Sequence, residues 1–404
     1  MERKRLKILN LIDTYFPVVG GISTVVDRSS IALSKYADVT VGTVKAKNYT
    51  DPERPYKILR CKGYNNAITS DGLAYPGLDK KFRKEVEEGG YDIIHCHSPA
   101  NLMNYAFKVG KKLNIPVVAT VHSIFKPDVK HYVRSEHIAN LITSHFMKKT
   151  NKADYVWAVT GYCRDYVRPF GVTKDVTVMN NAIEFVAPSN TEELEERINK
   201  LHNISKDTFV MTFVSRMVKV KNVDLIIDAM NLLKDKNLDL KIFLVGDGDY
   251  FKKTQAKVKK LGLENYIIMT GMVKDRDLLA AYYARANLVL FPSYMDSAGL
   301  IQVEAAAYSK PTLVIENMAP AEKMTDMVNG LIAKNEPQSY ADKMLWAYEN
   351  KEKLVEIGKQ AYKTLYRVYS DKAVTDEILE TYYRIIDDYK QKHKTEKGAW
   401  KKEF

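Results

Sequence analysis

Residues 213–229 read FVSRMVKVKNVDLIIDA, and this stretch contains the end of an apolar run, two cations and an amphipathic segment. Arg216 directly follows a predicted strand, and Lys221 comes five residues later. The apolar residues after Lys221 recur at helical spacing, which predicts a helix. Ligands of open α/β sheets bind at the carboxyl ends of the strands, where such a turn lies. We therefore expect Arg216 and Lys221 to bind an anionic group such as a diphosphate.

The same alternation of short apolar runs and longer amphipathic runs extends over most of the chain, which predicts strands joined by helical crossovers. The expected strands form two series, 7–12, 38–43, 92–95, 116–120, 155–160 and 176–179, then 209–215, 241–245, 267–270, 288–291 and 312–315. This pattern predicts an α/β protein with two parallel sheets. Residues 186–206 contain Pro188 and a charged helix-like stretch, and we interpret them as the connection between two domains.

The composition argues against several classes of protein. The 404 residues suffice for two or three domains, and 46% hydrophobic and 28% charged residues are typical of a globular protein. Three cysteines without C-x-x-C spacing argue against a disulfide framework and a structural zinc site. The N-terminus lacks the apolar core of a secretory signal, and no stretch is long enough to span a membrane, so we expect a cytoplasmic protein.

The net charge of +12 belongs mainly to the N-terminal part of the chain. Residues 1–150 contain 24 basic and 14 acidic residues, a difference of +10. Such an excess favours polyanionic partners, namely nucleic acid, phosphorylated substrates or an anionic membrane surface. No recognised nucleic-acid module accompanies the charge, so we expect no nucleic acid among the partners.

Two glycine turns and an acidic pair follow other predicted strands. PVVGGIS places Gly20 and Gly21 before a helical pattern, where free backbone amides attract phosphate, and LVGDGDY places Gly248 in a similar turn. The stretch LFPSYMDSAGLIQVEAAAY contains Asp296 and, eight positions later, Glu304. If the residues after the glycine are helical, Glu304 lies a turn into the helix and Asp296 lies in the loop before it. The loop amides and the helix N-terminus would then face the same ligand.

With these features the chain resembles a retaining glycosyltransferase of the GT-B fold, similar to glycosyltransferase family 4, over essentially its whole length. The most specific similarities are SRMVKVKN, LVGDGDY, LLAAYYARANLVLFPS and the acidic pair with its seven-residue gap; HCHSP, IPVVATVHS, KADYVWAVT and VMNNAIE agree more weakly. The resemblance implies two Rossmann-like domains facing a central cleft. The acceptor domain would comprise residues 1–186, with helices at about 375–404 packed on it, and the nucleotide-sugar donor domain residues 187–374.

The resemblance also implies roles for individual residues. Arg216 and Lys221 would bind the donor diphosphate, and Glu304 would bind the nucleotide ribose. Asp296 would lie close to the donor sugar, and His122, in TVHS, matches the family histidine that approaches the transferred sugar. The implied catalytic residues are therefore His122 and Asp296. The other donor-binding residues that we expect are Gly20, Gly21, Gly248, Ser297, Gly299 and Leu300.

Two residues depart from the family pattern. Asp296 is one methylene shorter than the family glutamate, and Asn181 in VMNNAIE replaces a glycine. Neither change removes a charged group, so we expect an active enzyme, with a non-catalytic partner subunit as the alternative. The resemblance implies retention at the anomeric carbon. Fixed cations would stabilise the departing phosphate, so we expect no metal and no other cofactor; His95 and His97, in HCHS, lack a third metal ligand at suitable spacing.

Residues 124–149 read IFKPDVKHYVRSEHIANLITSHFMKK and mix cations with apolar side chains. A basic amphipathic helix suits an anionic lipid surface, and HSIFKPDVKHYV also resembles bacterial diacylglycerol glucosyltransferases. We therefore expect a membrane-lipid or lipid-linked acceptor and peripheral binding to the cytoplasmic face of the membrane, with a soluble glycan, a cell-wall polymer or a protein as alternative acceptors. The expected donor is UDP-glucose or a related UDP-hexose, with GDP-mannose as the alternative. The predicted acceptor and membrane patch consists of Lys126, Lys130, Arg134, Lys148 and Lys149.

Overall fold

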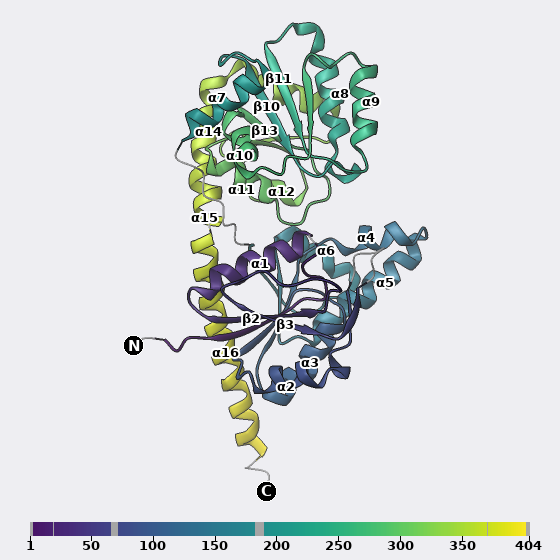
Figure 1. Ribbon diagram of the computed structural model, residues 1–404, viewed down its shortest axis with the longest axis vertical. Helices are drawn as coiled ribbons and strands as arrows, with labels where there is room; N and C mark the ends of the chain where they lie inside the picture. The colour runs from purple at the N-terminus through teal and green to yellow at the C-terminus, as the bar shows by residue number, and fades with distance from the viewer. Residues whose placement is uncertain (1–2, 19, 66–71, 182–189, 370, 401–404) are drawn as a thin grey trace. The chain divides into compact units, whose positions relative to one another are not determined.

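The computed structural model describes residues 3–18, 20–65, 72–181, 190–369 and 371–400. The chain forms two compact units, Met1–Glu184 together with Asp371–Phe404, and Phe185–Ser370. Figure 1 shows that each unit contains a sheet with helices on both faces, which is the Rossmann-like architecture that the sequence predicts. The boundary predicted between residues 186 and 187 lies outside the described residues.

The described residues of the N-terminal unit form a seven-stranded parallel sheet in the order β3-β2-β1-β6-β7-β8-β9. Its strands are β1 (Lys7–Leu11), β2 (Asp38–Val44), β3 (Lys57–Cys61), β6 (Ile93–Cys96), β7 (Val117–Val121), β8 (Tyr155–Ala158) and β9 (Val176–Val178). A separate antiparallel pair consists of β4 (Gly63–Asn65) and β5 (Gly72–Ala74). Strand β1 buries Ile8, Leu9 and Leu11 completely, because helices cover both faces of the sheet.

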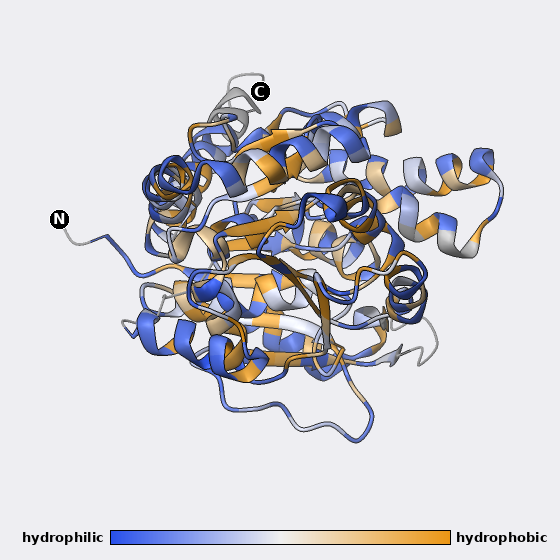
Figure 2. Cartoon of the chain, turned by 90° about the horizontal axis from the view of Figure 1, so that it is seen from above, coloured by the Kyte–Doolittle hydropathy of each residue, from blue (hydrophilic) through white to orange (hydrophobic). Residues whose placement is uncertain are grey.

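Helices of the N-terminal unit cover this sheet with apolar stripes. They are α1 (Gly21–Ser34), α2 (Lys80–Glu88), α3 (Asn101–Leu113), α6 (Gly161–Val167) and α16 (Asp371–Trp400), whereas α4 (Phe125–Tyr132) and α5 (Glu136–Lys149) project away from the sheet (Figure 1). Helix α16 completes the core although it comes from the other end of the chain: Ile378, Tyr382 and Ile385 recur at helical spacing and pack in the same cluster as Ile8 of β1. Figure 2 shows the resulting pattern, with largely orange strands and helices that are blue over much of their surface.

The described residues of the C-terminal unit form a six-stranded parallel sheet in the order β12-β11-β10-β13-β14-β15. Its strands are β10 (Phe209–Val214), β11 (Leu240–Val245), β12 (Ile267–Gly271), β13 (Leu288–Phe291), β14 (Thr312–Ile315) and β15 (Leu331–Ala333). Its helices are α7 (Thr191–His202), α8 (Val223–Leu233), α9 (Phe251–Lys260), α10 (Arg276–Arg285), α11 (Leu300–Ala307), α12 (Ala319–Glu322), α13 (Pro337–Glu349), α14 (Lys351–Ala361) and α15 (Arg367–Tyr369).

The charged stretch that we interpreted as part of an interdomain connection is helix α7. Leu194 and Ile198, four residues apart, are buried in a cluster with residues of α10. Asn203 ends the helix in the left-handed conformation, and Arg197 pairs with Asp275, the cap of α10. Helix α7 is therefore an integral part of the C-terminal unit. The many charges on its outer face conceal this in the sequence.

Candidate active site

The cations Arg216 and Lys221 both follow β10 at the carboxyl edge of the C-terminal sheet. Arg216 is exposed, and the described residues give its side chain no hydrogen bond or ion pair. Lys221 ends a short 3₁₀ turn, Lys219–Lys221, just before α8. Its Nζ lies 2.5 Å from Oδ2 of Asp296 and 5.3 Å from the centre of the Phe291 ring. The structure thus brings Lys221 and Asp296 together from β10 and β13, two neighbouring strands.

Asp296 is held on both of its oxygens. Oδ2 accepts from Lys221, and Oδ1 accepts from the backbone amides of Ala298 at 3.1 Å and Gly299 at 2.9 Å. Burial alone would raise the pKa of Asp296, but the Lys221 ammonium and these two amides outweigh it, so the pKa is lowered. Asp296 is therefore a carboxylate at neutral pH, and it organises the loop before α11.

Helix α11 begins in that same loop and carries Glu304, as the sequence predicts. Gly299 is the helix N-cap and has φ of 60°, and a Cβ there would lie 2.1 Å from Oε1 of Gln302, so only glycine fits. Ser297 and Leu300 lie on either side of it. Glu304 accepts a hydrogen bond of 2.8 Å from the hydroxyl of Tyr283, which is fully buried on α10. The Tyr283 contact fixes one oxygen of Glu304.

Gly248 has a structural role that the sequence analysis did not predict. Gly246 and Gly248 have φ of 137° and 155°, and a Cβ on them would lie 1.9 Å from the Ser215 carbonyl oxygen and 2.4 Å from that of Met217. The amide of Met217 in turn donates to Asp247 at 2.9 Å. The two glycines therefore let the turn after β11 pack against the residues on either side of Arg216, which positions that cation.

Gly20 and Gly21 present the opposite case. A Cβ at Gly20 would meet nothing closer than Ser23 Oγ at 3.9 Å, and one at Gly21 would meet nothing within 4 Å. Neither glycine has a φ in the left-handed region, and Gly20 is the extended N-cap of α1. The described residues therefore give no packing reason for these glycines. The space beside them lies at a helix N-terminus, where backbone amides attract anions.

His122 follows β7 and belongs to a buried group of histidines in the N-terminal unit. Its Nε2 lies 2.9 Å from Nδ1 of His97, and the rings of His97 and His95 are 4.0 Å apart. Burial lowers the pKa of His122 to about 4 and that of His97 well below its ordinary value. Burial also lowers the pKa of His95 well below its ordinary value, so all three are neutral near pH 7. Among the described residues, no group of three or more His, Cys, Asp or Glu side chains could hold a metal ion.

The sequence analysis missed several polar residues beside these histidines. Asn10 of β1 contacts His97, and Tyr382 of α16 and Thr120 of β7 contact the two ring nitrogens of His95 at 2.5 and 2.6 Å. Asn10 follows two fully buried apolar residues in β1, and a polar residue within such a run is the signal that could have identified it. Tyr382 comes from a helix far away in the sequence, and no local pattern indicates this contact.

Asp13 is a further residue that the sequence analysis passed over. It lies just after β1, is buried, and accepts from the Ser98 hydroxyl at 2.8 Å and from the Leu102 amide at 3.1 Å. Burial raises its pKa to about 6, against the opposing effect of these hydrogen bonds. Asp13 therefore ties the N-terminus of α3 to the carboxyl edge of the sheet.

The predicted basic patch lies on two helices and the turn between them rather than on one helix. Residues 133–135 interrupt the helical pattern, and Ser135 caps α5 by accepting a hydrogen bond from the amide of Ile138. Lys126 and Lys130 on α4 both pair with Glu136, which lies at the start of α5. Arg134 and Lys148 are exposed, whereas Lys149 is partly buried, with Nζ 4.4 Å from the centre of the Phe146 ring.

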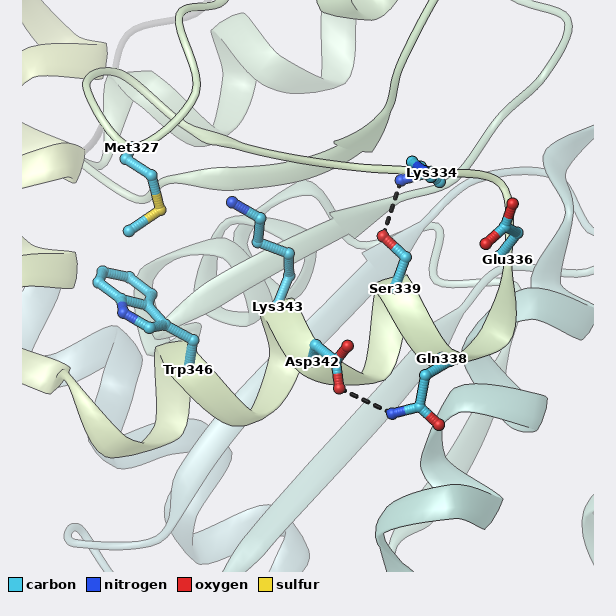
Figure 3. A pocket seen from close by; sticks show the side chains of 8 residues that line it. All are labelled: Met327, Lys334, Glu336, Gln338, Ser339, Asp342, Lys343 and Trp346. Carbon is cyan, nitrogen blue, oxygen red and sulfur yellow. Dashed lines mark hydrogen bonds between the residues drawn. The ribbon is translucent and has the colours of Figure 1, made fainter.

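A concave region of about 560 Å³ lies elsewhere on the C-terminal unit and contains none of the predicted residues. Figure 3 shows Met327 and Trp346 at one end of it and Glu336 at the other, along α13. Lys343 pairs there with Asp326, and Gln338 donates to Asp342 on the same helix. Its polar groups therefore contact one another.

None of the described helices is long and apolar enough to cross a membrane.

Two Rossmann-like units, with a cation pair and an acidic pair at the carboxyl edge of the second, define the class of protein. The chain belongs to the glycosyltransferases of the family 4 type: residues 19–185 match the family model Glycosyltransferase Family 4, and residues 194–364 match Glycosyl transferases group 1. The prediction of a GT-B fold is confirmed.

Individual relatives agree with this assignment. An uncharacterized glycosyltransferase of Methanocaldococcus jannaschii is 27% identical over 354 residues, which cover 85% of this chain and 89% of that protein. The alpha-monoglucosyldiacylglycerol synthase of Streptococcus pneumoniae is 23% identical over 79% of this chain and 73% of that protein. The crystal structure of Anabaena HepE in complex with UDP and glucose has a TM-score of 0.70 at 19% identity and covers 93% of this chain and 99% of that one.

Proposed function

We propose that this protein is a retaining glycosyltransferase that transfers a hexose from UDP-glucose, or a related UDP-hexose, to a membrane-lipid or lipid-linked acceptor. The observation that carries the proposal is the charged group at the carboxyl edge of the C-terminal sheet. There Arg216 is exposed and Lys221 contacts Asp296 at 2.5 Å, beside the N-terminus of α11. This arrangement offers positive charge and backbone amides to a diphosphate, with a carboxylate beside them for sugar hydroxyls.

The chemistry follows from this charge distribution. When the bond between the anomeric carbon and the phosphate oxygen breaks, negative charge grows on the departing diphosphate and positive charge grows on the sugar. Arg216 and Lys221 are placed to stabilise the negative charge: Gly246 and Gly248 fix the backbone on either side of Arg216, and the ion pair with Asp296 holds Lys221 near the N-terminus of α11. Asp296, ionised at neutral pH, is suited to stabilise the positive charge on the sugar. We propose that these fixed charges make a metal unnecessary.

Retention in a single step requires that the acceptor oxygen attack the face from which the diphosphate leaves, and this is the route that we propose. Asp296 is a poor base for the acceptor's proton, because Lys221 and two backbone amides lower its pKa, and neutral His122 is also weakly basic, since burial lowers its pKa to about 4. We therefore assign the acceptor's proton to the departing phosphate oxygen. His122 then orients the donor sugar and does not act as a general base.

Helix α5 supports a lipid acceptor. Ile138 and Leu141 are 48% and 58% exposed, and with His145 and Lys148 they recur at spacings of three and four residues along one face. An apolar stripe that ends in a cation suits the boundary of an anionic membrane, on whose cytoplasmic face we propose that the protein binds. The Streptococcus pneumoniae relative is by its name a synthase of a glucosyl lipid, which favours the same class of acceptor.

The donor is tested first by thermal unfolding with UDP, GDP, ADP and their sugars. A ligand that binds only the folded protein raises Tm by mass action, so we expect a rise with UDP and UDP-hexoses. A rise with GDP-mannose alone would mean that GDP-mannose is the donor, and the proposed type of reaction would stand. No rise with any nucleotide would contradict the proposal and favour the non-catalytic alternative.

The acceptor is tested by transfer to diacylglycerol in anionic vesicles. We expect Leu141→Asp to weaken vesicle binding and transfer to lipid by at least about tenfold, because it places a charge in the apolar stripe. Leu201→Asp is a matched control, since Leu201 is 56% exposed on helix α7 of the other unit. Equal effects of the two changes, or transfer to soluble glycans in preference to lipid, would contradict the lipid acceptor.

A further inference from the structure

A chain of hydrogen bonds crosses three neighbouring strands of the N-terminal sheet and ends at His122. The Ser30 hydroxyl on α1 lies 3.1 Å from Nδ2 of Asn10 in β1. Oδ1 of Asn10 lies 3.3 Å from Nε2 of His97, after β6, and Nδ1 of His97 lies 2.9 Å from Nε2 of His122, after β7. All four side chains are more than nine-tenths buried, so the bonds are shielded from water.

The direction of this chain follows from the Asn10 amide. Because Nδ2 of Asn10 donates to Ser30, its Oδ1 faces His97 and can only accept. Nε2 of His97 must then carry the proton. A neutral imidazole has one N–H group, so Nδ1 of His97 accepts from Nε2–H of His122. Nδ1 of His122 is thereby left with a lone pair.

That nitrogen has no hydrogen-bond partner within the described part of the chain, although it is buried. A buried acceptor that stays unsatisfied is costly, so such an atom usually marks a place where a ligand or water donates. His122 also lines a cavity of about 30 Å³, together with His97, Asn180, Asn181 and others. This is room for a water molecule or a hydroxyl group. His122 also follows β7 at the ligand-binding edge of the sheet.

We propose that Asn10 and His97 are positioning residues that hold His122 in its Nε2–H tautomer, so that Nδ1 accepts a hydrogen bond from a hydroxyl of the transferred sugar. This inference rests on the proposed function and adds residues that set the direction of a bond in its donor site. The burial that lowers the pKa of both histidines keeps them neutral, which the chain requires.

A second chain in the same unit supplies a matched control. The Tyr382 hydroxyl, His95 and the Thr120 hydroxyl are joined at 2.5 and 2.6 Å, and none of these bonds involves His122. Tyr382→Phe therefore removes a buried hydroxyl of the same cluster without breaking the chain from Ser30 to His122. Asn10→Leu removes the amide that gives that chain its direction.

The experiment compares donors in which each sugar hydroxyl in turn is replaced by hydrogen or by fluorine. For one position we expect both replacements to lower kcat/KM of the wild-type enzyme by about 10- to 100-fold, because neither substituent can donate. Asn10→Leu should reduce this discrimination to less than about threefold, and Tyr382→Phe should preserve it. In parallel, the ¹⁵N shifts of the His122 ring in the full-length protein should show a bare Nδ1 and a protonated Nε2.

Several results would overturn the inference while the proposed function stands: transfer without discrimination at any position, discrimination that survives in Asn10→Leu, or a protonated Nδ1. A fluoro donor that matches the parent sugar would show that Nδ1 donates, which reverses the chain and also contradicts it. If Asn10→Leu does not fold, the wild-type ¹⁵N shifts and the wild-type donor series decide. Absence of transfer from every donor is the one result that overturns the proposed function as well.

Discussion

The carboxyl edges of the two sheets hold their polar side chains in different electrostatic states. At the N-terminal edge His97 and His122 are buried and neutral, and burial raises the pKa of Asp13 to about 6. At the C-terminal edge Lys221 and Asp296 are charged and in contact, with side chains 19% and 18% exposed. Desolvation suppresses charge where no counter-ion is near, whereas pairing preserves it where one is.

This difference divides the proposed work between the two units. A neutral hydrogen-bond chain can recognise hydroxyl groups but does little for a growing negative charge. A pair of cations stabilises the departing diphosphate but distinguishes one sugar from another poorly. The predictions that follow test the division by adding or removing charge, space and hydrogen bonds at each edge.

The largest effect is expected from removing charge at the C-terminal edge. Arg216→Ala and Lys221→Ala should each lower kcat by about 100- to 1,000-fold, because each removes a fixed cation from the departing phosphate. Arg216 is exposed, so its replacement should leave Tm almost unchanged. Lys219→Ala, an exposed lysine in the same turn, is the control and should change kcat by less than about threefold. Near-normal turnover by Arg216→Ala would refute the diphosphate site.

Asp13→Asn tests whether the N-terminal edge disfavours charge. A carboxyl whose pKa is raised by folding stabilises the protein at low pH, and this contribution is lost as pH rises through about 6. The variant lacks this loss, so its free energy of unfolding relative to wild type should rise by about 2 kcal/mol between pH 4 and pH 7.5. Denaturant unfolding at several pH values measures the difference.

Asp79 provides the matching control, because its pKa is lowered in the folded protein. Backbone amides of Phe82 and Lys62 donate to its carboxylate, which caps α2. The stabilisation from Asp79 is present above its unfolded pKa and is lost as pH falls through its folded pKa. Asp79→Asn should therefore show no rise in relative stability between pH 4 and pH 7.5. The same trend in both variants would show that burial of Asp13 is not the cause.

Glycines at the two edges should respond differently to an added methyl group. Gly248→Ala should lower stability by roughly 1–3 kcal/mol, because its Cβ would lie 2.4 Å from the Met217 carbonyl oxygen. Gly21→Ala should leave Tm unchanged and reduce the rise in Tm that the donor produces, because open space surrounds that position. Loss of stability in Gly21→Ala would mean that this glycine serves the fold.

The sequence predicts the strands well where they are apolar throughout. Every predicted strand is present within a few residues of its expected ends, because buried parallel strands give continuous apolar runs. Strand β3, an edge strand with the sequence KILRC, was missed because its two cations leave only a short apolar run. The three-residue strands β4, β5 and β15 were also missed, although β9 is equally short and was predicted.

The candidate site was predicted where a motif carries it and missed where only three-dimensional packing does. Arg216, Lys221, Asp296 and Glu304 lie close to one another in the sequence or repeat a family spacing, but their roles stay predictions. Asn10 and Asp13 belong to no motif and are single polar residues in or just after an apolar run. Their partners come from other strands and from α3, so pairing across the sheet is needed to recognise them.

The smallest effect is expected from Asp296→Glu, which restores the family residue. The carboxylate keeps its charge beside Lys221, and the added methylene alters only how it meets the amides of Ala298 and Gly299. We expect kcat/KM to change by less than about fivefold, which corresponds to about 1 kcal/mol. Asp296→Asn is the charge control and should cost more, because it leaves Lys221 without its counter-ion. A gain of more than tenfold in Asp296→Glu would contradict an intact site, since it would show that the shorter side chain had already cost the enzyme its activity. A small change would show that the C-terminal edge requires the ion pair with Lys221 rather than a particular length of the side chain.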